Sequence, residues 1–158
     1  MATMPIEPGE LRDGELTLEL EGFGIHPVHH APTYHFRMVH DETAEEMGQI
    51  RLRIGSSHHI DMYAGHIGYA VEPAFRGHHY AARSVRLLMT LAVANGIDPL
   101  WITCDPENTA SRRTLELAGA KFVEIVDVPE DCIIRQSGHP RKCRFRLATG
   151  VSTSRKLE

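Results

Sequence analysis

The segment Gly65-His-Ile-Gly-Tyr-Ala-Val-Glu-Pro-Ala-Phe-Arg-Gly-His-His-Tyr-Ala81 decides the fold of this 158-residue chain. Its first part, residues 66–71, is rich in β-branched and aromatic residues, which predicts a strand that ends before Pro73. From Tyr80 the apolar positions change to helical spacing, at Val85, Leu88, Met89 and Ala92, and Asn95-Gly96 provides a stop. The predicted order is therefore strand, turn, helix.

The turn between this strand and this helix has the composition of an anion-binding loop. It reads Arg76-Gly-His-His-Tyr-Ala81 and leads into a helix start, where backbone N–H groups lack partners and point at one spot. Gly77 and the small Ala81 let a ligand approach the backbone, and the Arg76 guanidinium suits phosphate oxygens. We therefore expect the turn to bind a pyrophosphate; an ordinary β–α connection is the alternative.

The turn resembles the acyl-CoA-binding motif of the Gcn5-related N-acetyltransferases (GNAT), Arg/Gln-x-x-Gly-x-Gly/Ala between a strand and a helix. Arg76 and Ala81 match the ends of the motif, and His79 stands at its central glycine. The resemblance implies the following cofactor-binding residues: Tyr69, Ala70, Val71, Arg76, Gly77, His78, His79, Tyr80 and Ala81. The phrase from Gly65 to Pro73 also resembles a subgroup of acetyltransferases assigned by sequence, which indicates no substrate.

A second stretch, Asp105-Pro-Glu-Asn-Thr-Ala-Ser-Arg-Arg-Thr-Leu-Glu-Leu-Ala-Gly-Ala120, resembles the family pattern Asn-x-x-Ser/Ala-x-x-x-Leu/Tyr-x-x-x-Gly. The resemblance implies that Asn108 and Ser111 bind the cofactor from one helical face, because they are three residues apart; helix capping is their other use. Many family members carry a tyrosine at the position of Leu115 that protonates the leaving thiolate. Here that role falls to Ser111, to water or to no group.

The resemblance covers residues 48–148 and implies a single α/β (α+β) domain. Its central sheet is expected to be mixed and mostly antiparallel, with a splayed parallel pair and flanking helices. The implied activity is acetyl transfer from acetyl-CoA, as cosubstrate, to an amine by direct attack. Two other classes stay open: a catalytically silent acyl-CoA-binding or regulatory domain, and a partner-binding module that keeps only the fold.

Direct attack needs a neutral amine, so a proton acceptor is expected near the central strand. His66 lies on that strand, and its ordinary pKa of about 6.5 suits proton abstraction at neutral pH. We therefore take His66 as the candidate general base, with a histidine that fills one face of the strand as the alternative. Asp61 and Tyr63, just upstream, are the next candidates.

The remaining elements are short. Residues 16–20, 34–39 and 47–54 are predicted strands, the last two an antiparallel pair whose polar alternates Arg37, Gln49, Arg51 and Arg53 mark a solvated face. Residues 22–32 and 55–61 are predicted loops. Residues 100–104 should form a strand parallel to 66–71, followed by a helix from an Asp105-Pro106 cap to Ala118. Residues 121–128 and 143–148 should pair as an antiparallel hairpin.

Charge is unevenly distributed along the chain. Its net charge is −4, but residues 1–50 carry −8, because this part contains ten acidic residues and only two basic ones, Arg12 and Arg37. A positive remainder suits a polyanionic cofactor, and an acidic N-terminal part suits a cationic acceptor, either a small molecule or a peptide amine. Solvated glutamates on outer faces are the alternative. No basic stripe with interleaved aromatic residues exists, so nucleic acid is not expected as a partner.

These elements predict a domain over residues 15–148, after a loose lead-in over 1–14 and before a disordered tail over 149–158 that ends in a cloning remnant, Leu157-Glu158. No apolar run has membrane-spanning length and no signal-peptide core is present, so no membrane partner and a cytoplasmic location are expected; a homodimer stays open. Three widely spaced cysteines predict reduced thiols. The histidine doublets face opposite sides of any strand, so no metal is expected.

Overall fold

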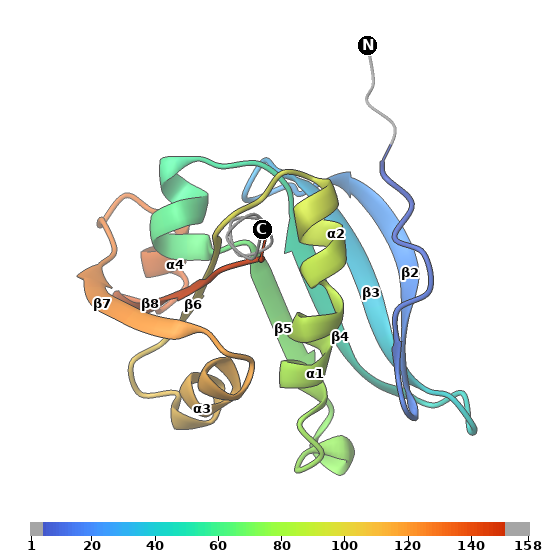
Figure 1. Cartoon of the computed structure of the whole chain (residues 1–158). Coiled ribbons are helices and arrows are strands. Elements are labelled where there is room, and N and C mark those ends of the chain that lie inside the picture. Colours follow the sequence, from blue (N-terminus) through green and yellow to red (C-terminus); the bar gives the residue numbers. More distant parts are fainter. Residues whose placement is uncertain (1–4, 151–158) are drawn as a thin grey trace.

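The computed structural model describes residues 5–150, and its strands form two sheets. The first sheet is antiparallel throughout, in the order β1 (Arg12–Asp13), β2 (Leu16–Ile25), β3 (Pro32–His40), β4 (Glu46–Arg53) and β5 (Ile67–Val71). The second is also antiparallel, in the order β6 (Leu100–Cys104), β8 (Arg141–Leu147) and β7 (Lys121–Asp127). Figure 1 shows the two sheets diverging, with α3 (Thr109–Leu117) below the opening.

The core lies between the first sheet and the helices α1 (Tyr80–Leu87) and α2 (Met89–Ala94) (Figure 1). Alternate residues of β2, β3 and β4 point inward and are buried: Leu16, Leu18, Tyr34, Phe36, Met38, Ile50 and Leu52. Burial of such side chains contributes about 1.5–3 kcal/mol each. The alternating pattern therefore predicted these strands correctly.

Two boundaries in the first sheet differ from the prediction. β2 continues to Ile25, through residues expected to be a loop, because a bulge between Leu20 and Gly22 absorbs one residue and keeps the pairing with β3. β1 was not predicted; it pairs Arg12 with Thr17, and the adjacent Leu11 is buried. The end of the predicted lead-in is therefore part of the sheet.

The strands β5 and β6 meet at one end and then separate, which is the splayed parallel pair that was expected. The backbone N–H of His66 donates to the carbonyl oxygen of Trp101 at 2.6 Å, and each strand otherwise pairs within its own sheet. Gly65 allows this junction: its φ is +74°, and a Cβ there would lie 3.0 Å from the Trp101 oxygen. The separation beyond the junction leaves room for a site.

The predicted central helix is interrupted by one residue. The N–H of Leu88 is shared between the carbonyls of Ser84 and Val85, which divides the helix into α1 and α2. The helix α3 begins later than predicted, because its cap is Asn108 and not Asp105: the Asn108 Oδ1 accepts from the N–H of Ser111 at 3.0 Å.

The predicted hairpin of β7 and β8 is confirmed, but the segment that joins them contains a helix that was not predicted, α4 (Ile133–Gln136). Two further short helices are η1 (Ile60–Ala64) and η2 (Pro73–Phe75). Cys104, Cys132 and Cys143 are free thiols, as predicted. Within residues 5–150, none of the helices combines the length and the apolar character needed to cross a membrane. Most of the predicted disordered tail, with Leu157-Glu158, and residues 1–4 lie outside the described residues.

Candidate functional site

A cavity of about 480 Å³ lies where β5, the turn after it, and α3 face one another. It brings together residues that are up to 45 positions apart in the sequence, from Tyr69 to Thr114. Its lining includes ten of the residues predicted to hold the cofactor: Tyr69, Ala70, Val71, Arg76, Gly77, His79, Tyr80, Ala81, Asn108 and Ser111. The predicted residue that does not line it is His78, whose ring packs against the ring of Tyr80 with centroids 5.3 Å apart.

The turn at this cavity has the backbone geometry that the glycine motif requires. Gly77 has a φ of +97°, and His79 has φ 60° and ψ 28°, in the left-handed region, directly before α1. Residues other than glycine pay roughly 1–2 kcal/mol in this conformation, which is why a glycine is usual at the position of His79. The Nε of Arg76 donates to the Val71 carbonyl at 3.2 Å, which leaves its terminal nitrogens available to an anion.

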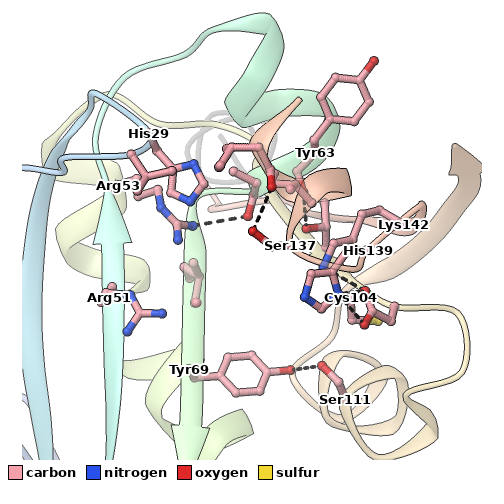
Figure 2. A pocket seen from close by; sticks show the side chains of 18 of the residues that line it. His29, Arg51, Arg53, Tyr63, Tyr69, Cys104, Ser111, Ser137, His139 and Lys142 are labelled. Carbon is pink, nitrogen blue, oxygen red and sulfur yellow. Dashed lines mark hydrogen bonds and ion pairs between the residues drawn. The ribbon is translucent and has the colours of Figure 1, made fainter. Parts of the chain in front are cut away.

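Tyr69 and Ser111 close the inner end of this cavity from opposite sides. The Tyr69 hydroxyl and the Ser111 Oγ lie 2.7 Å apart and share a hydrogen bond between β5 and α3 (Figure 2). Burial raises the pKa of Tyr69 to about 12, so its hydroxyl stays protonated at neutral pH. Leu115 is fully buried in the core. A pair of hydroxyl groups, from Tyr69 and Ser111, therefore lies at this inner end of the cavity.

A second cavity, also of about 480 Å³, continues from the first on the other side of this pair. The two cavities share Tyr69, Asn108 and Ser111. The second is surrounded by basic side chains, as Figure 2 shows: Arg51, Arg53, His29, His139 and Lys142. The acidic residue in its lining is Asp105. The second cavity is hereafter called the basic cavity.

Arg51 and Arg53 line one wall of the basic cavity, where the sequence predicted a solvated face. That prediction is wrong for Arg53, which is only 5% exposed and donates from Nη1 to the carbonyls of Gly65 (2.9 Å) and Ala64 (3.2 Å). Burial, and to a smaller extent the charge of Arg51, lowers the pKa of Arg53 to about 10. The segment after β4 covers this face and excludes water from the guanidinium.

The opposite wall of the basic cavity carries a linked group of three side chains. Asp105 accepts from the His139 Nδ1 at 2.7 Å and from the Lys142 Nζ at 3.0 Å. Burial acts to raise the pKa of Asp105, but the hydrogen bonds from Lys142 and His139 outweigh it and hold this pKa below its ordinary value. Within residues 5–150, the Nε2 of His139 has no hydrogen-bond partner, so it is available to a molecule in the cavity.

His66 lines neither of these cavities. Its ring is 2% exposed, and its Nδ1 accepts from the N–H of Trp101 at 2.9 Å. The proton of the neutral ring therefore sits on Nε2, which donates to the Gly55 carbonyl at 3.0 Å. Burial lowers the pKa of His66. Nδ1 is occupied by Trp101 of β6 and Nε2 by Gly55 in the loop after β4, and this geometry favours the alternative of a structural histidine over the predicted role of general base.

The two other candidates for the general base, Asp61 and Tyr63, lie in different surroundings in the structure. Asp61 lies beside His66, 3.9 Å from its Nε2, and does not line the basic cavity. Tyr63 does line it.

The acidic residues of the N-terminal part also lie elsewhere. Asp13 and Glu15 form ion pairs with Arg83, and Asp41 forms one with Arg12. Within the described part of the chain, no carboxylate from residues 1–50 lines the basic cavity. These carboxylates connect strands to a helix and one strand to another through ion pairs. They therefore give no support to the predicted cationic acceptor.

Comparison with known proteins identifies the family. Residues 3–121, well over half of the chain, match the profile of the acetyltransferase (GNAT) domain. The chain belongs to this family. Curated protein sequences gave no significant match to this GNAT domain.

Solved acetyltransferase structures share the fold of this GNAT domain. A protein of Vibrio cholerae, proposed to be a ribosomal-protein-serine acetyltransferase, is 20% identical, with a TM-score of 0.57 over 73% of this chain and 64% of its own. The ribosomal-protein-S5-alanine acetyltransferase of Vibrio fischeri is 14% identical, with a TM-score of 0.59 over 75% of this chain and 63% of its own. The microcin C7 self-immunity acetyltransferase MccE, solved with acetyl-CoA and AMP, is 15% identical, with a TM-score of 0.57 over 73% of this chain and 61% of its own.

The GNAT domain thus spans less than two thirds of each of these three structures. At these identities the likeness establishes the fold, and the predicted fold class is confirmed.

Sequence reasoning missed several residues of the basic cavity. Arg51 and Arg53 carried a signal, because two arginines at alternate positions of one strand share a face. His139 and Lys142 carried none, since they come from a Gly- and Pro-containing segment without periodicity. They reach the cavity only because the chain that follows this segment pairs with β6 as strand β8.

Proposed function

We propose that this GNAT domain is an acyltransferase that moves an acetyl group from acetyl-CoA to an amine by direct nucleophilic attack. The observation that carries the proposal is the meeting of two cavities at the hydroxyl pair of Tyr69 and Ser111. One cavity begins at a phosphate-binding turn, and the other opens on the far side of the pair. A thioester at the pair would be accessible to both.

The first cavity has the parts that acetyl-CoA needs. The diphosphate would lie against the turn from Arg76 to Ala81, at the positive end of α1. The pantetheine arm would run between β5 and α3, past Asn108. Because β5 pairs with β4 on one side only over its described length, its other edge has backbone groups free to bind the amide groups of the arm. The complex of MccE with acetyl-CoA supports this cosubstrate.

The transfer needs one proton removed and one supplied. The amine nitrogen attacks the carbonyl carbon, the new C–N bond forms, and the C–S bond breaks to release a thiolate. The Ser111 Oγ–H would donate to the thiolate sulfur, the Tyr69 hydroxyl at 2.7 Å would replace that proton, and Tyr69 would regain its own proton from water. A positioned acid of this kind contributes roughly 10²–10⁴-fold to the rate.

His139 is the best-placed group to accept the proton of the amine. Its Nδ1–H is fixed on the Asp105 carboxylate, which holds the ring in one tautomer and leaves Nε2 as the acceptor. The arrangement also stabilises the imidazolium that forms. It replaces His66 as the candidate base because it faces the basic cavity.

The test of the proposal combines two measurements on the whole chain. Calorimetric titration with CoA measures binding at the first cavity, and thiol release from acetyl-CoA across a panel of amines measures transfer. We expect CoA binding together with amine-dependent thiol release, with the acetylated amine identified by mass. Tight CoA binding without thiol release for any amine would contradict acetyl transfer. It would favour the second candidate function, a catalytically silent acyl-CoA-binding domain. The burial of Leu115 in the core also favours that second candidate.

A further inference from the structure

Arg51 and Arg53 converge on one point in the basic cavity. They lie two residues apart on β4, so their side chains leave the same face of the strand (Figure 2). Arg51 stands opposite Gly68 of β5. A Cβ at Gly68 would lie 3.1 Å from the Arg51 Nη2 and 3.5 Å from the Arg53 Nη2. The missing side chain of Gly68 is what keeps that space open.

The charge of these two guanidinium groups is not balanced by the protein. Among residues 5–150, no carboxylate lies within 4.0 Å of either group. The Nε atoms of both are buried and have no hydrogen-bond partner. Arg37, Arg83 and Arg144, by contrast, each pair with a carboxylate. A buried and unpaired cation is costly, and a bound anion removes that cost.

The other basic groups of the cavity do not compete for an anion. On the opposite wall of the cavity, Lys142 and His139 are both paired with Asp105, at 3.0 Å and 2.7 Å. His29 is neutral at physiological pH, because burial lowers its pKa to about 3. The attraction for an anion is therefore concentrated at Arg51 and Arg53.

We propose that Arg51 and Arg53 bind an anionic group, a carboxylate or a phosphate, carried by the amine acceptor itself. The inference rests on the proposed acetyl transfer, because the same cavity reaches Tyr69 and Ser111, where the amine would react. Two guanidinium forks match the geometry of either oxyanion. An acceptor held at one end by the arginines presents its amine at the other.

The first test compares matched amines that differ only in the anion. The pairs are ethanolamine with phosphoethanolamine and propylamine with β-alanine, assayed by thiol release at constant ionic strength. We expect kcat/KM to favour one anionic member by roughly 10- to 100-fold, the range of one charge-assisted bond. The pair that shows it identifies the anion as phosphate or carboxylate. In Arg51→Gln the ratio of kcat/KM between the anionic and the neutral member of that pair should fall toward one. Arg37→Gln, which removes an equal charge outside the cavity, should keep the ratio of the wild type.

The second test does not depend on activity. Protein saturated with CoA, so that the turn at Arg76 is occupied, is heated with inorganic phosphate or with chloride at equal ionic strength, and acetate serves as the carboxylate probe. Phosphate or acetate should raise the Tm of the wild type and of Arg37→Gln, but not of Arg51→Gln or of Gly68→Ala, whose methyl group fills the space. An equal rise in all four proteins, or none in any, would overturn the anion site.

The two proposals fail differently. If amines are acetylated without preference for an anionic member and neither anion raises the Tm, then acetyl transfer stands and the anion site is wrong. If no amine releases thiol but an anion raises the Tm in an Arg51-dependent manner, then the anion site stands and transfer is wrong.

Discussion

Replacing His79 by glycine should stabilise the protein, which is unusual for removing a side chain. His79 holds φ 60° and ψ 28° before α1, a conformation that costs a non-glycine residue roughly 1–2 kcal/mol. Glycine avoids that cost but loses about 0.5–1 kcal/mol through the greater freedom of its unfolded chain. The His79 side chain is exposed and no hydrogen bond from it holds the turn, so little packing is lost. The expected net gain is roughly 0.5–1 kcal/mol.

This gain corresponds to a rise in Tm of roughly 1–4 °C for a chain of this size. Thermal unfolding of His79→Gly, His79→Ala and His78→Gly provides the comparison. His79→Ala keeps the Cβ and should show no gain, whereas His78→Gly, at a position without positive φ, should lose stability. CoA titration of His79→Gly should show affinity at or above that of the wild type. If His79→Gly lowers the Tm as much as His78→Gly does, then the backbone strain assigned to the turn is wrong.

Three further predictions concern CoA binding at the turn from Arg76 to Ala81, protein stability at acid pH, and the group that accepts the proton of the amine. Arg76→Ala should weaken CoA binding roughly 10- to 100-fold by calorimetry, because one charge-assisted contact to phosphate is lost; unchanged affinity would exclude the turn as the phosphate site. Glu15 has its pKa lowered from 4.5 to about 2, mainly by the hydrogen bond from Arg83. Its contribution to stability is therefore present above pH 4.5 and disappears as the pH falls toward 2, so urea unfolding of Glu15→Gln should depend less on pH in that window than the wild type. His139→Gln should lower kcat with amine acceptors by roughly 10²–10⁴-fold, the contribution of a positioned base, while CoA affinity by calorimetry stays near that of the wild type; near-native turnover would return the role of base to water or to Tyr63.

The local structure of the turn from Arg76 to Ala81 could be predicted from the sequence because all of its determinants are local. The strand before it, the turn and the helix after it are consecutive, and the positive φ of Gly77 and His79 is a property of the turn itself. The cap of α3 was misplaced by three residues because Asp105 looks like a cap in isolation. Its carboxylate is instead held by Lys142, 37 positions later.

The basic cavity could not be predicted, because it depends on which face of each strand is covered. Arg53 has the same place in the alternating pattern as Gln49, yet Arg53 is buried and Gln49 is exposed. His66 looked suitable as a base by position and by ordinary pKa. The direction of its ring was decided by the N–H of Trp101 on a strand from the other sheet. Neither fact has a counterpart in local sequence.

The proposed chemistry takes place at the hydroxyl pair where the two cavities meet. Single-turnover thiol release by Ser111→Ala, with acetyl-CoA bound and a good amine acceptor at saturation, tests it most directly. We expect the rate to fall roughly 10²–10⁴-fold, much more than any loss in CoA affinity measured on the same protein, and we expect a fall in rate for Tyr69→Phe as well. A rate for Ser111→Ala close to that of the wild type would contradict the claim that this pair is the reactive centre.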